Sequence, residues 1–152
     1  MKIEDNKVIF DSDDIFNLDI TLNGVIKSAL VTFKESKRYG IPGDLLDNPH
    51  EYSDDEMKEA TARWEEILDD MIYAFSIDDP YDAYDDQDKS PYDYSQSWCN
   101  ENKQFKPALK EGFTKEDADR FEEKRDAVIK GMKARIKRGR ELFIKYYDNL
   151  WV

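Results

Sequence analysis

The chain has 152 residues, of which 38% are charged, and its net charge at pH 7 is −12. This charge argues against autonomous binding to nucleic acid, because that affinity comes largely from cations that contact phosphates. Eight Phe, nine Tyr and three Trp argue against an intrinsically disordered chain, which would lack aromatic residues. The length and composition therefore predict one folded domain, residues 1–152, with a heavily charged surface.

The cysteine content and the N-terminal residues indicate the cellular compartment in which we expect the protein. The single cysteine, Cys99, excludes an intrachain disulfide and a cysteine-based zinc site. Met1 leads into Lys2, Glu4 and Asp5 without the apolar run of a signal peptide. No segment approaches the roughly 18 continuous apolar residues that a membrane span needs. We therefore expect a protein of a reducing cytoplasm that makes no contact with a membrane.

The N-terminal part predicts a short β element and then a first helix. Residues 2–10 favour a β-hairpin or a single strand. Ser12 is typical of a helix N-cap, and the apolar residues that follow at helical spacing predict a helix over about 13–35. Gly24 is costly in the middle of a helix, so it suggests a close crossing by another helix. The turn residues after Gly40 end this element.

The clearest helix signal lies over about 53–76. Ser53 followed three residues later by Glu56 is a capping box. Apolar residues at spacings of three and four predict a buried face, with Asp69 and Asp70 on the opposite, solvent-facing side. A helix with one apolar stripe needs partners to cover it.

A third helix is predicted over about 115–149, opened by Thr114. Gly131 and Gly139 are weak points, and Gly139 suggests a kink or break. The fold class is therefore mainly α, with three principal helices, a short N-terminal strand or hairpin and a long acidic loop. The predicted core draws on all three helices and consists of Trp64, Phe75, Phe33, Leu22, Phe121, Val128 and Phe143.

The acidic loop covers about 77–113. Seven aspartates and four tyrosines lie between residues 78 and 94, together with one lysine. Tyrosine combines apolar area with a hydrogen-bonding tip and therefore suits interfaces. A solvated loop, or a segment that pairs with the basic third helix, are the alternatives. We interpret the segment as a partner-binding surface made of Asp78, Asp79, Tyr81, Asp82, Tyr84, Asp85, Asp86, Asp88, Tyr92, Asp93 and Tyr94.

Four segments also carry a resemblance to known proteins. They are LD…FKE at 18–35, YGIP at 39–42, WEEILDDMIYAF at 64–75 and ELFIKYYDNLW at 141–151. In this order they resemble a set of small uncharacterised proteins of tailed bacteriophages, over roughly half of the chain. The resemblance implies a phage origin and a shared core, and it brings no catalytic motif.

Two E-x-x-D pairs are candidates for a metal site. This spacing places two carboxylates on one face of a helix, and all-α nucleotide pyrophosphatases hold Mg²⁺ with such carboxylates. In a chain with 35 acidic residues such pairs also arise by chance. A Mg-dependent nucleotide pyrophosphatase therefore stays an alternative, with Mg²⁺ held by Glu66, Asp69, Glu123 and Asp126.

The basic stretch of the third helix supports a different alternative. Its cations could bind an anionic nucleotide signal through charge-assisted hydrogen bonds, so that the protein would act as a sponge for that signal. The ordinary interpretation is an amphipathic helix with a charged outer face. The candidate ligand-binding residues are Lys130, Lys133, Arg135, Lys137, Arg138 and Arg140.

The leading hypothesis is a non-enzymatic phage accessory protein, without catalytic residues or a cofactor. In the cytoplasm of the infected cell it would bind and inhibit a host defence or nucleic-acid-processing protein that has a basic surface. An acidic surface can attract such a partner by mimicking the charge of DNA. This hypothesis involves no direct binding to nucleic acid or membrane, and it leaves open whether the chain forms a homo-oligomer.

Overall fold

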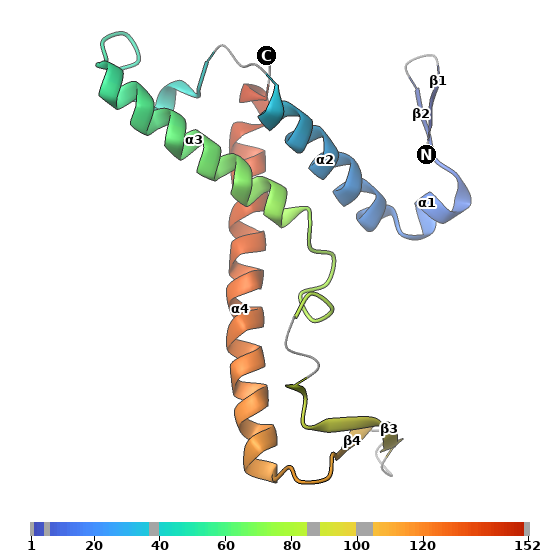
Figure 1. Ribbon diagram of the computed structural model, residues 1–152. Helices are drawn as coiled ribbons and strands as arrows, with labels where there is room; N and C mark the ends of the chain where they lie inside the picture. The colour runs from blue at the N-terminus through green and yellow to red at the C-terminus, as the bar shows by residue number, and fades with distance from the viewer. Residues whose placement is uncertain (1, 5–6, 37–39, 85–88, 100–104, 151–152) are drawn as a thin grey trace. The chain divides into compact units, whose positions relative to one another are not determined.

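The computed structural model describes the whole chain except residues 1, 5–6, 37–39, 85–88, 100–104 and 151–152. The fold is mainly α, as predicted (Figure 1). The chain forms two compact units: residues 1–78 with 134–152, and residues 79–133. Helix α4 (Lys115–Tyr146) contributes residues to both units. The expectation of a single domain over residues 1–152 stays a prediction.

The first unit begins with a β-hairpin, which is one of the two predicted alternatives. Strand β1 (Lys2–Glu4) pairs antiparallel with β2 (Lys7–Ile9), and Ile3 lies opposite Val8. The turn between the strands falls on residues 5–6, outside the described part of the chain.

The predicted first helix is in fact two helices. Helix α1 (Ser12–Phe16) is followed by α2 (Leu18–Glu35), and the break lies at Asn17, whose φ of −119° and ψ of 52° are not helical. The N-cap of α1 is Asp11, so the prediction of Ser12 was wrong by one residue. The Asp11 carboxylate accepts the N–H groups of residues 13 and 14, and Asp14 returns a bond to the Asp11 N–H.

Helix α3 (Asp54–Ala74) starts as its sequence predicts. The Ser53 N–H donates to Glu56 Oε2 at 2.7 Å, and the Glu56 N–H donates to Ser53 Oγ at 3.2 Å. A short 3₁₀ turn, η1 (Gly43–Leu45), precedes it.

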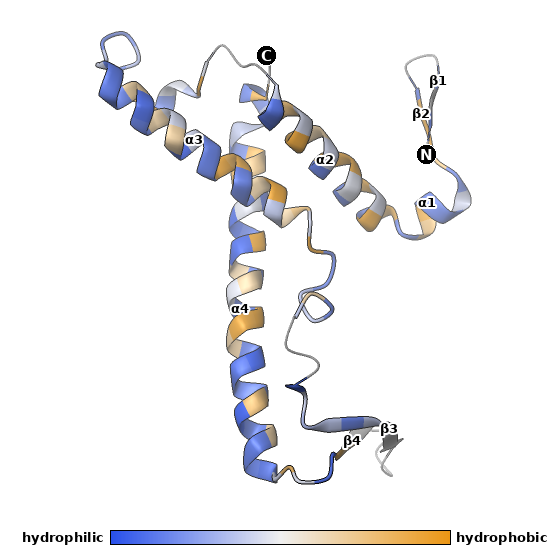
Figure 2. Ribbon diagram, in the orientation of Figure 1, coloured by the Kyte–Doolittle hydropathy of each residue, from blue (hydrophilic) through white to orange (hydrophobic). Residues whose placement is uncertain are grey.

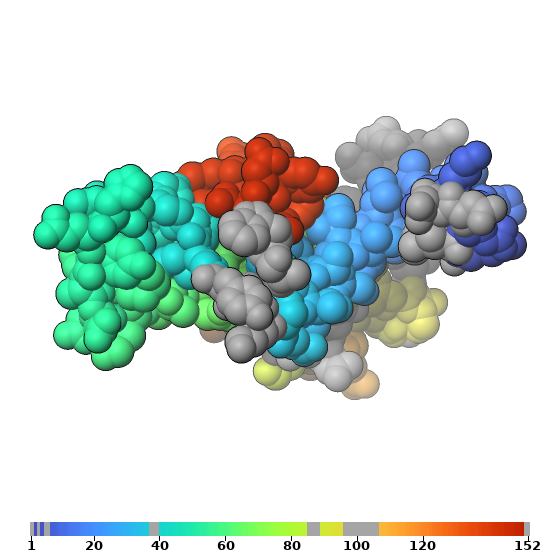
Figure 3. Space-filling view, turned by 90° about the horizontal axis from the view of Figure 1, so that it is seen from above, coloured from blue at the N-terminus to red at the C-terminus, as the bar shows by residue number. Residues whose placement is uncertain are grey.

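The core of the first unit lies between α2, α3 and the C-terminal part of α4. Trp64 packs edge-on against Tyr146, with ring centres 5.3 Å apart, and Phe75 packs in the same way against Phe143 at 5.1 Å. Figure 2 shows the apolar residues as separate orange bands between polar ones along each helix. In Figure 3 the end of α4 (red) lies against the cyan-to-green residues of this unit. Its buried residues are Leu30, Leu45, Ala60, Trp64, Leu68, Met71, Ala74, Phe75 and Tyr146.

Two predicted core residues are exposed. Leu22 is 41% exposed, because α2 reaches the core through Leu30, which is buried, and through the half-buried side chains of Ile26 and Phe33 farther along the helix. Val128 is 42% exposed, and the next residue of α4, Ile129, is buried in its place. Trp64 and Phe75 are confirmed as core, while Phe33, Phe121 and Phe143 are half-buried.

The second unit contains a sheet where a long loop was expected. Strand β3 (Tyr92–Cys99) pairs antiparallel with β4 (Phe105–Leu109), with Tyr92 opposite Leu109 and an irregular register after Asp93. The prediction of a long loop over about 77–113 was therefore wrong in its second half, which contains both strands. In the two paired strands the backbone N–H and C=O groups bind each other, whereas in a loop they would bind water.

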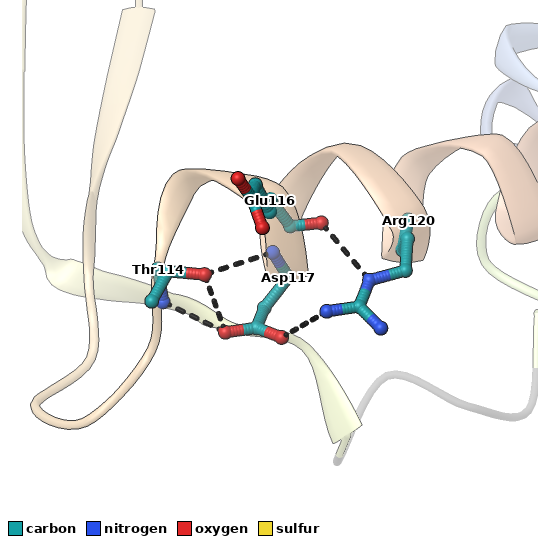
Figure 4. Close-up of polar contacts among 4 residues, drawn as sticks. All are labelled: Thr114, Glu116, Asp117 and Arg120. Atoms are coloured by element: carbon teal, nitrogen blue, oxygen red, sulfur yellow. Dashed lines mark hydrogen bonds and ion pairs between the residues drawn. The ribbon is translucent and has the colours of Figure 1, made fainter.

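Helix α4 begins at a side-chain cap, as the position of Thr114 predicts. The Thr114 N–H and Oγ1 both donate to Asp117 Oδ2, at 2.9 and 2.7 Å, and the Asp117 N–H donates to Thr114 Oγ1 at 3.2 Å (Figure 4). Arg120 adds a bond to Asp117 Oδ1 at 3.0 Å. The helix also ends by tightening, since residues 147–149 form a 3₁₀ turn, η3 (Tyr147–Asn149).

Gly139 marks a helix crossing and not a break. Helix α4 continues through Gly139, and this residue is buried against α3. A Cβ at Gly139 would overlap the carbonyl oxygen of Asp70 and lie 2.6 Å from Ala74 Cβ. By contrast, Gly24, for which a close crossing was predicted, has nothing within 4 Å of its Cβ position. Only a residue without a side chain allows α3 and α4 to approach this closely.

We expect Gly139→Ala to lower the free energy of unfolding by about 3 kcal/mol or more, because the new methyl group meets backbone atoms that cannot rotate away. Gly131→Ala is the matched control on the same helix. Its Cβ would meet nothing within 4 Å, so it should stabilise the helix by up to about 1 kcal/mol. Chemical denaturation followed by circular dichroism measures both, and equal effects of the two variants would contradict the close crossing.

Candidate functional site

Residues 78–84, the first part of the predicted acidic loop, form a turn that follows α3. Asp79 Oδ1 accepts the Tyr81 N–H at 2.8 Å, and the carbonyl of Asp79 accepts the Ala83 N–H at 3.1 Å. Asp78 accepts a bond from the Asn23 side chain of α2 at 3.2 Å. Side chains that cap their own backbone in this way are typical of turns that begin with Asp.

Three carboxylates of this turn lack a counter-cation. Asp78, Asp79 and Asp82 are exposed, and within the described part of the chain none of them forms an ion pair. The tyrosines Tyr81 and Tyr94, 47% and 55% exposed, belong to the same segment. The segment thus presents unneutralised charge together with accessible aromatic area.

The other predicted partner-binding residues are placed differently. Asp93 is half-buried and accepts the N–H and Oγ of Ser95, at 3.0 and 2.6 Å. Tyr84 is buried. Tyr92 is half-buried, and its hydroxyl donates to Glu122 of α4. Burial of the hydroxyl and, to a smaller extent, its bond to the Glu122 carboxylate raise the pKa of Tyr92 to about 12. Predicted partner-binding residues that lie outside the described part of the chain are Asp85, Asp86 and Asp88.

The basic stretch of α4 is largely engaged within the protein. Lys133 Nζ lies 4.7 Å from the ring centre of Tyr81, and the Arg140 guanidinium lies 5.9 Å from that of Phe75. Lys137 pairs with Glu141 at 3.7 Å. Lys130 is exposed. Most of these cations therefore have partners and do not form a free anion-binding cluster.

The remaining two cations, Arg135 and Arg138, bind a carboxylate that the sequence analysis placed on the wrong face. Arg135 Nε donates to Asp70 Oδ1 at 2.9 Å, and Arg138 Nη2 donates to Asp70 Oδ2. Arg135 also stacks over Tyr73, with its guanidinium carbon 4.0 Å from the ring centre. Asp70, 6% exposed, is therefore buried at the crossing of α3 and α4 and not solvent-facing.

A spacing signal could have located Asp70. It lies three residues after Ile67 and four before Ala74, which are both apolar, so it shares their face of the helix. A single acid in that stripe requires cations on the facing helix. Arg135 and Arg138, three residues apart, supply them from one side of α4.

The ion pairs also set the charge state of Asp70. Burial alone raises the pKa of its carboxyl, but the hydrogen bonds from Arg138 and Arg135 outweigh burial and hold the pKa below its ordinary value of 3.8. The carboxylate is thus ionised at neutral pH, and both its oxygens are occupied by arginine.

The E-x-x-D pairs do not assemble into a metal site in the described part of the chain. Asp69 binds Lys34 of α2, and Asp126 binds the neighbouring Arg125 at 3.3 Å. The Glu66 pair belongs to the first unit and the Glu123 pair to the second. Among the residues that the structure describes, no group of three or more His, Cys, Asp or Glu side chains could hold a metal ion.

We expect Asp70→Asn to lower the free energy of unfolding by about 2 kcal/mol at pH 7, because it removes two charge-assisted bonds at a buried position. Asp69→Asn is the matched control, one residue away on the same helix. Its side chain is 54% exposed, so loss of its pair with Lys34 should cost less than about 1 kcal/mol. Urea denaturation of both variants gives the comparison, and a larger loss for Asp69→Asn would contradict the role of Asp70.

The same variant predicts a pH dependence. A carboxyl whose pKa is lowered in the folded state stabilises the fold above its unfolded-state pKa, and this contribution is lost as the pH falls through the folded-state pKa. The stability difference between the wild type and Asp70→Asn should therefore be constant from about pH 5 to 7 and shrink below about pH 4. Denaturation at a series of pH values measures it, and a difference that grows in acid would contradict the lowered pKa.

The described residues contain no helix that is both long enough and apolar enough to cross a membrane. Comparison with known proteins gives no match: no protein-family model, no curated protein sequence and no solved structure is significantly similar to the chain. Inferences about function therefore rest on the contacts, burial and charges of the chain's own residues.

Proposed function

We propose that the chain is a non-catalytic phage accessory protein that acts in the cytoplasm of the infected cell. It binds a host protein that has a basic surface, and it inhibits that protein by covering this surface. The binding element is the acidic segment, defined as residues 78–94. The observation that carries the proposal is the set of exposed carboxylates without a counter-cation at Asp78, Asp79 and Asp82.

The distribution of charge in the chain supports this segment as the binding element. The net charge of −12 attracts basic surfaces from a distance. The cations that could neutralise the acidic segment from within are mostly engaged, since Arg135 and Arg138 bind Asp70 and Lys137 binds Glu141. Electrostatic complementarity of this kind raises the rate of association and selects against acidic partners.

Exposed tyrosines give the segment more than charge. Tyr81 and Tyr94 offer apolar area and a hydroxyl at low entropic cost, which is why tyrosine is enriched at interfaces. A basic protein that normally binds nucleic acid offers arginine and lysine side chains to phosphates. The same side chains can pair with aspartates and stack on tyrosine rings.

The two alternatives from the sequence receive less support. A nucleotide sponge needs several cations that are free to bind one anion, whereas three of the six candidates, Arg135, Lys137 and Arg138, are paired with carboxylates of the chain. A Mg-dependent pyrophosphatase needs clustered carboxylates, and none cluster among the described residues.

The test is an affinity pull-down from host lysate with the variant that carries Asp78→Asn, Asp79→Asn and Asp82→Asn. Asparagine keeps the carbonyl oxygen that accepts the bonds from Asn23 and Tyr81, so the turn should persist while three charges are lost. We expect the wild type to retain a basic host protein at about 0.1 M salt and release it at about 1 M, because the Debye length falls from about 10 Å to about 3 Å. The triple variant should retain at least tenfold less.

The matched control changes three exposed acids elsewhere, Asp47→Asn, Glu51→Gln and Glu59→Gln, and gives the same net charge. This control should retain the partner like the wild type. Equal losses in both variants would show that only total charge matters, and retention that does not depend on salt would contradict an electrostatic interface.

A further inference from the structure

The second unit contains a pocket of about 200 Å³ whose walls are mainly aromatic. The rings of Tyr81, Tyr84, Tyr94 and Phe121 line it together with Ser90. One acidic and one basic side chain, Asp82 and Arg125, complete the lining. Pockets for drug-sized ligands measure about 300–1,000 Å³, so this one has room for a single ring system.

A buried hydroxyl in this lining lacks a partner. Tyr84 is 6% exposed, and within the described part of the chain its hydroxyl has no hydrogen-bond partner. The Tyr84 ring packs edge-on against Phe121 of α4, with ring centres 6.1 Å apart, and the Tyr84 N–H donates to the carbonyl of Tyr81 at 3.4 Å. Buried polar groups in folded proteins are almost always paired, so an orphaned hydroxyl requires an explanation.

Two further polar groups of the lining can also bind a ligand. Ser90 is buried, and its Oγ accepts the Tyr92 N–H at 3.3 Å, which leaves the hydroxyl proton to be donated. Arg125 is half-buried and donates to Asp126 through Nε and Nη2, both at 3.3 Å, so its Nη1 is not used in these bonds. The lining thus combines several donors with the acceptor oxygens of Asp82.

The charges of the lining select for a neutral ligand. The two charged side chains of the lining, Asp82 and Arg125, have opposite signs, so the lining has no net charge and offers a charged ligand of either sign no net attraction. Aromatic walls favour a flat ring, which can pack face-on or edge-on against them. Hydrogen-bond donors and acceptors on the ring edge would satisfy Tyr84, Ser90, Asp82 and Arg125.

From these contacts we propose that the pocket binds an uncharged, planar heteroaromatic ring of nucleobase size. The ring packs between the tyrosines and hydrogen-bonds to the Tyr84 hydroxyl through its edge. The pocket shares Tyr81, Asp82 and Tyr94 with the proposed protein-binding segment, but binding of a small ring can be measured without the host partner. The ring could come from a free nucleoside or from a base of single-stranded nucleic acid. We expect a free nucleoside, because the aspartates of residues 78–94 would repel the phosphates of a nucleic acid.

The experiment titrates the full chain with adenosine, guanosine, cytidine and uridine, followed by calorimetry and by saturation-transfer NMR of the ligand protons. At least one nucleoside should bind, and its monophosphate and a short single-stranded oligonucleotide should both bind more weakly than the nucleoside. Binding of the oligonucleotide alone would assign the surface to a nucleic acid and overturn the proposal. Absence of binding by all four nucleosides at millimolar concentration would overturn it as well.

Tyr84→Phe removes only the hydroxyl and should weaken nucleoside binding at least tenfold. Tyr52→Phe is the matched control, since Tyr52 is 49% exposed and lies in the first unit; it should bind like the wild type. Without ligand, Tyr84→Phe should keep or raise the midpoint of thermal unfolding, because it removes an unsatisfied buried group. A lowered midpoint would show that the hydroxyl has a structural partner, and unchanged binding would show that it does not touch the ring; either result overturns the proposal.

Discussion

The close crossing of α3 and α4 organises the first unit. Gly139 lets the backbone of α4 approach the backbone of α3 at Asp70, where any larger residue would collide. At this same point the Asp70 carboxylate receives Arg135 and Arg138, so a steric constraint and an ion pair fix one contact. The aromatic pairs Trp64–Tyr146 and Phe75–Phe143 then pack the core on the same two helices. A substitution elsewhere in the core can be accommodated by repacking of neighbouring side chains. A larger residue at Gly139 cannot, because it would meet the backbone of Asp70.

This crossing also determines which charges remain available. A helix with as many cations as α4 would attract anions if its arginines were free. Asp70 binds two of them, Glu141 pairs with Lys137, and Lys133 and Arg140 lie over aromatic rings, so most of these cations have a partner within the chain. The exposed aspartates Asp78, Asp79 and Asp82, by contrast, form no ion pair within the described part of the chain. The proposed binding to a basic protein follows from this internal pairing as much as from composition.

Local signals in the sequence predict the helices well and their contacts poorly. The capping box at Ser53, the Thr114 cap and the apolar stripe of α3 depend on neighbouring residues, and all are found in the structure. The strand β3 carries the aromatic residues Tyr92, Tyr94 and Trp98, separated by two and four residues as on one face of a strand. Its pairing with β4 nevertheless depends on residues farther along the chain. Gly139 and the pocket around Tyr84 take their roles from another element, so spacing within one helix or turn cannot reveal them. The spacing in α3 indicates the buried position of Asp70 but not which cations bind it. The charge of the acidic segment was readable from sequence, whereas the burial of Tyr84 was not.

The crossing constrains how this chain can diverge. A substitution at Gly139 that adds a side chain would force α3 and α4 apart, and the arginines of α4 would then no longer reach Asp70. We therefore expect residues 74 and 139 to stay small only together with a buried acid at position 70. Relatives too distant to match over their whole length should still keep this combination: a glycine in a long basic helix, opposite an alanine four residues after a buried aspartate.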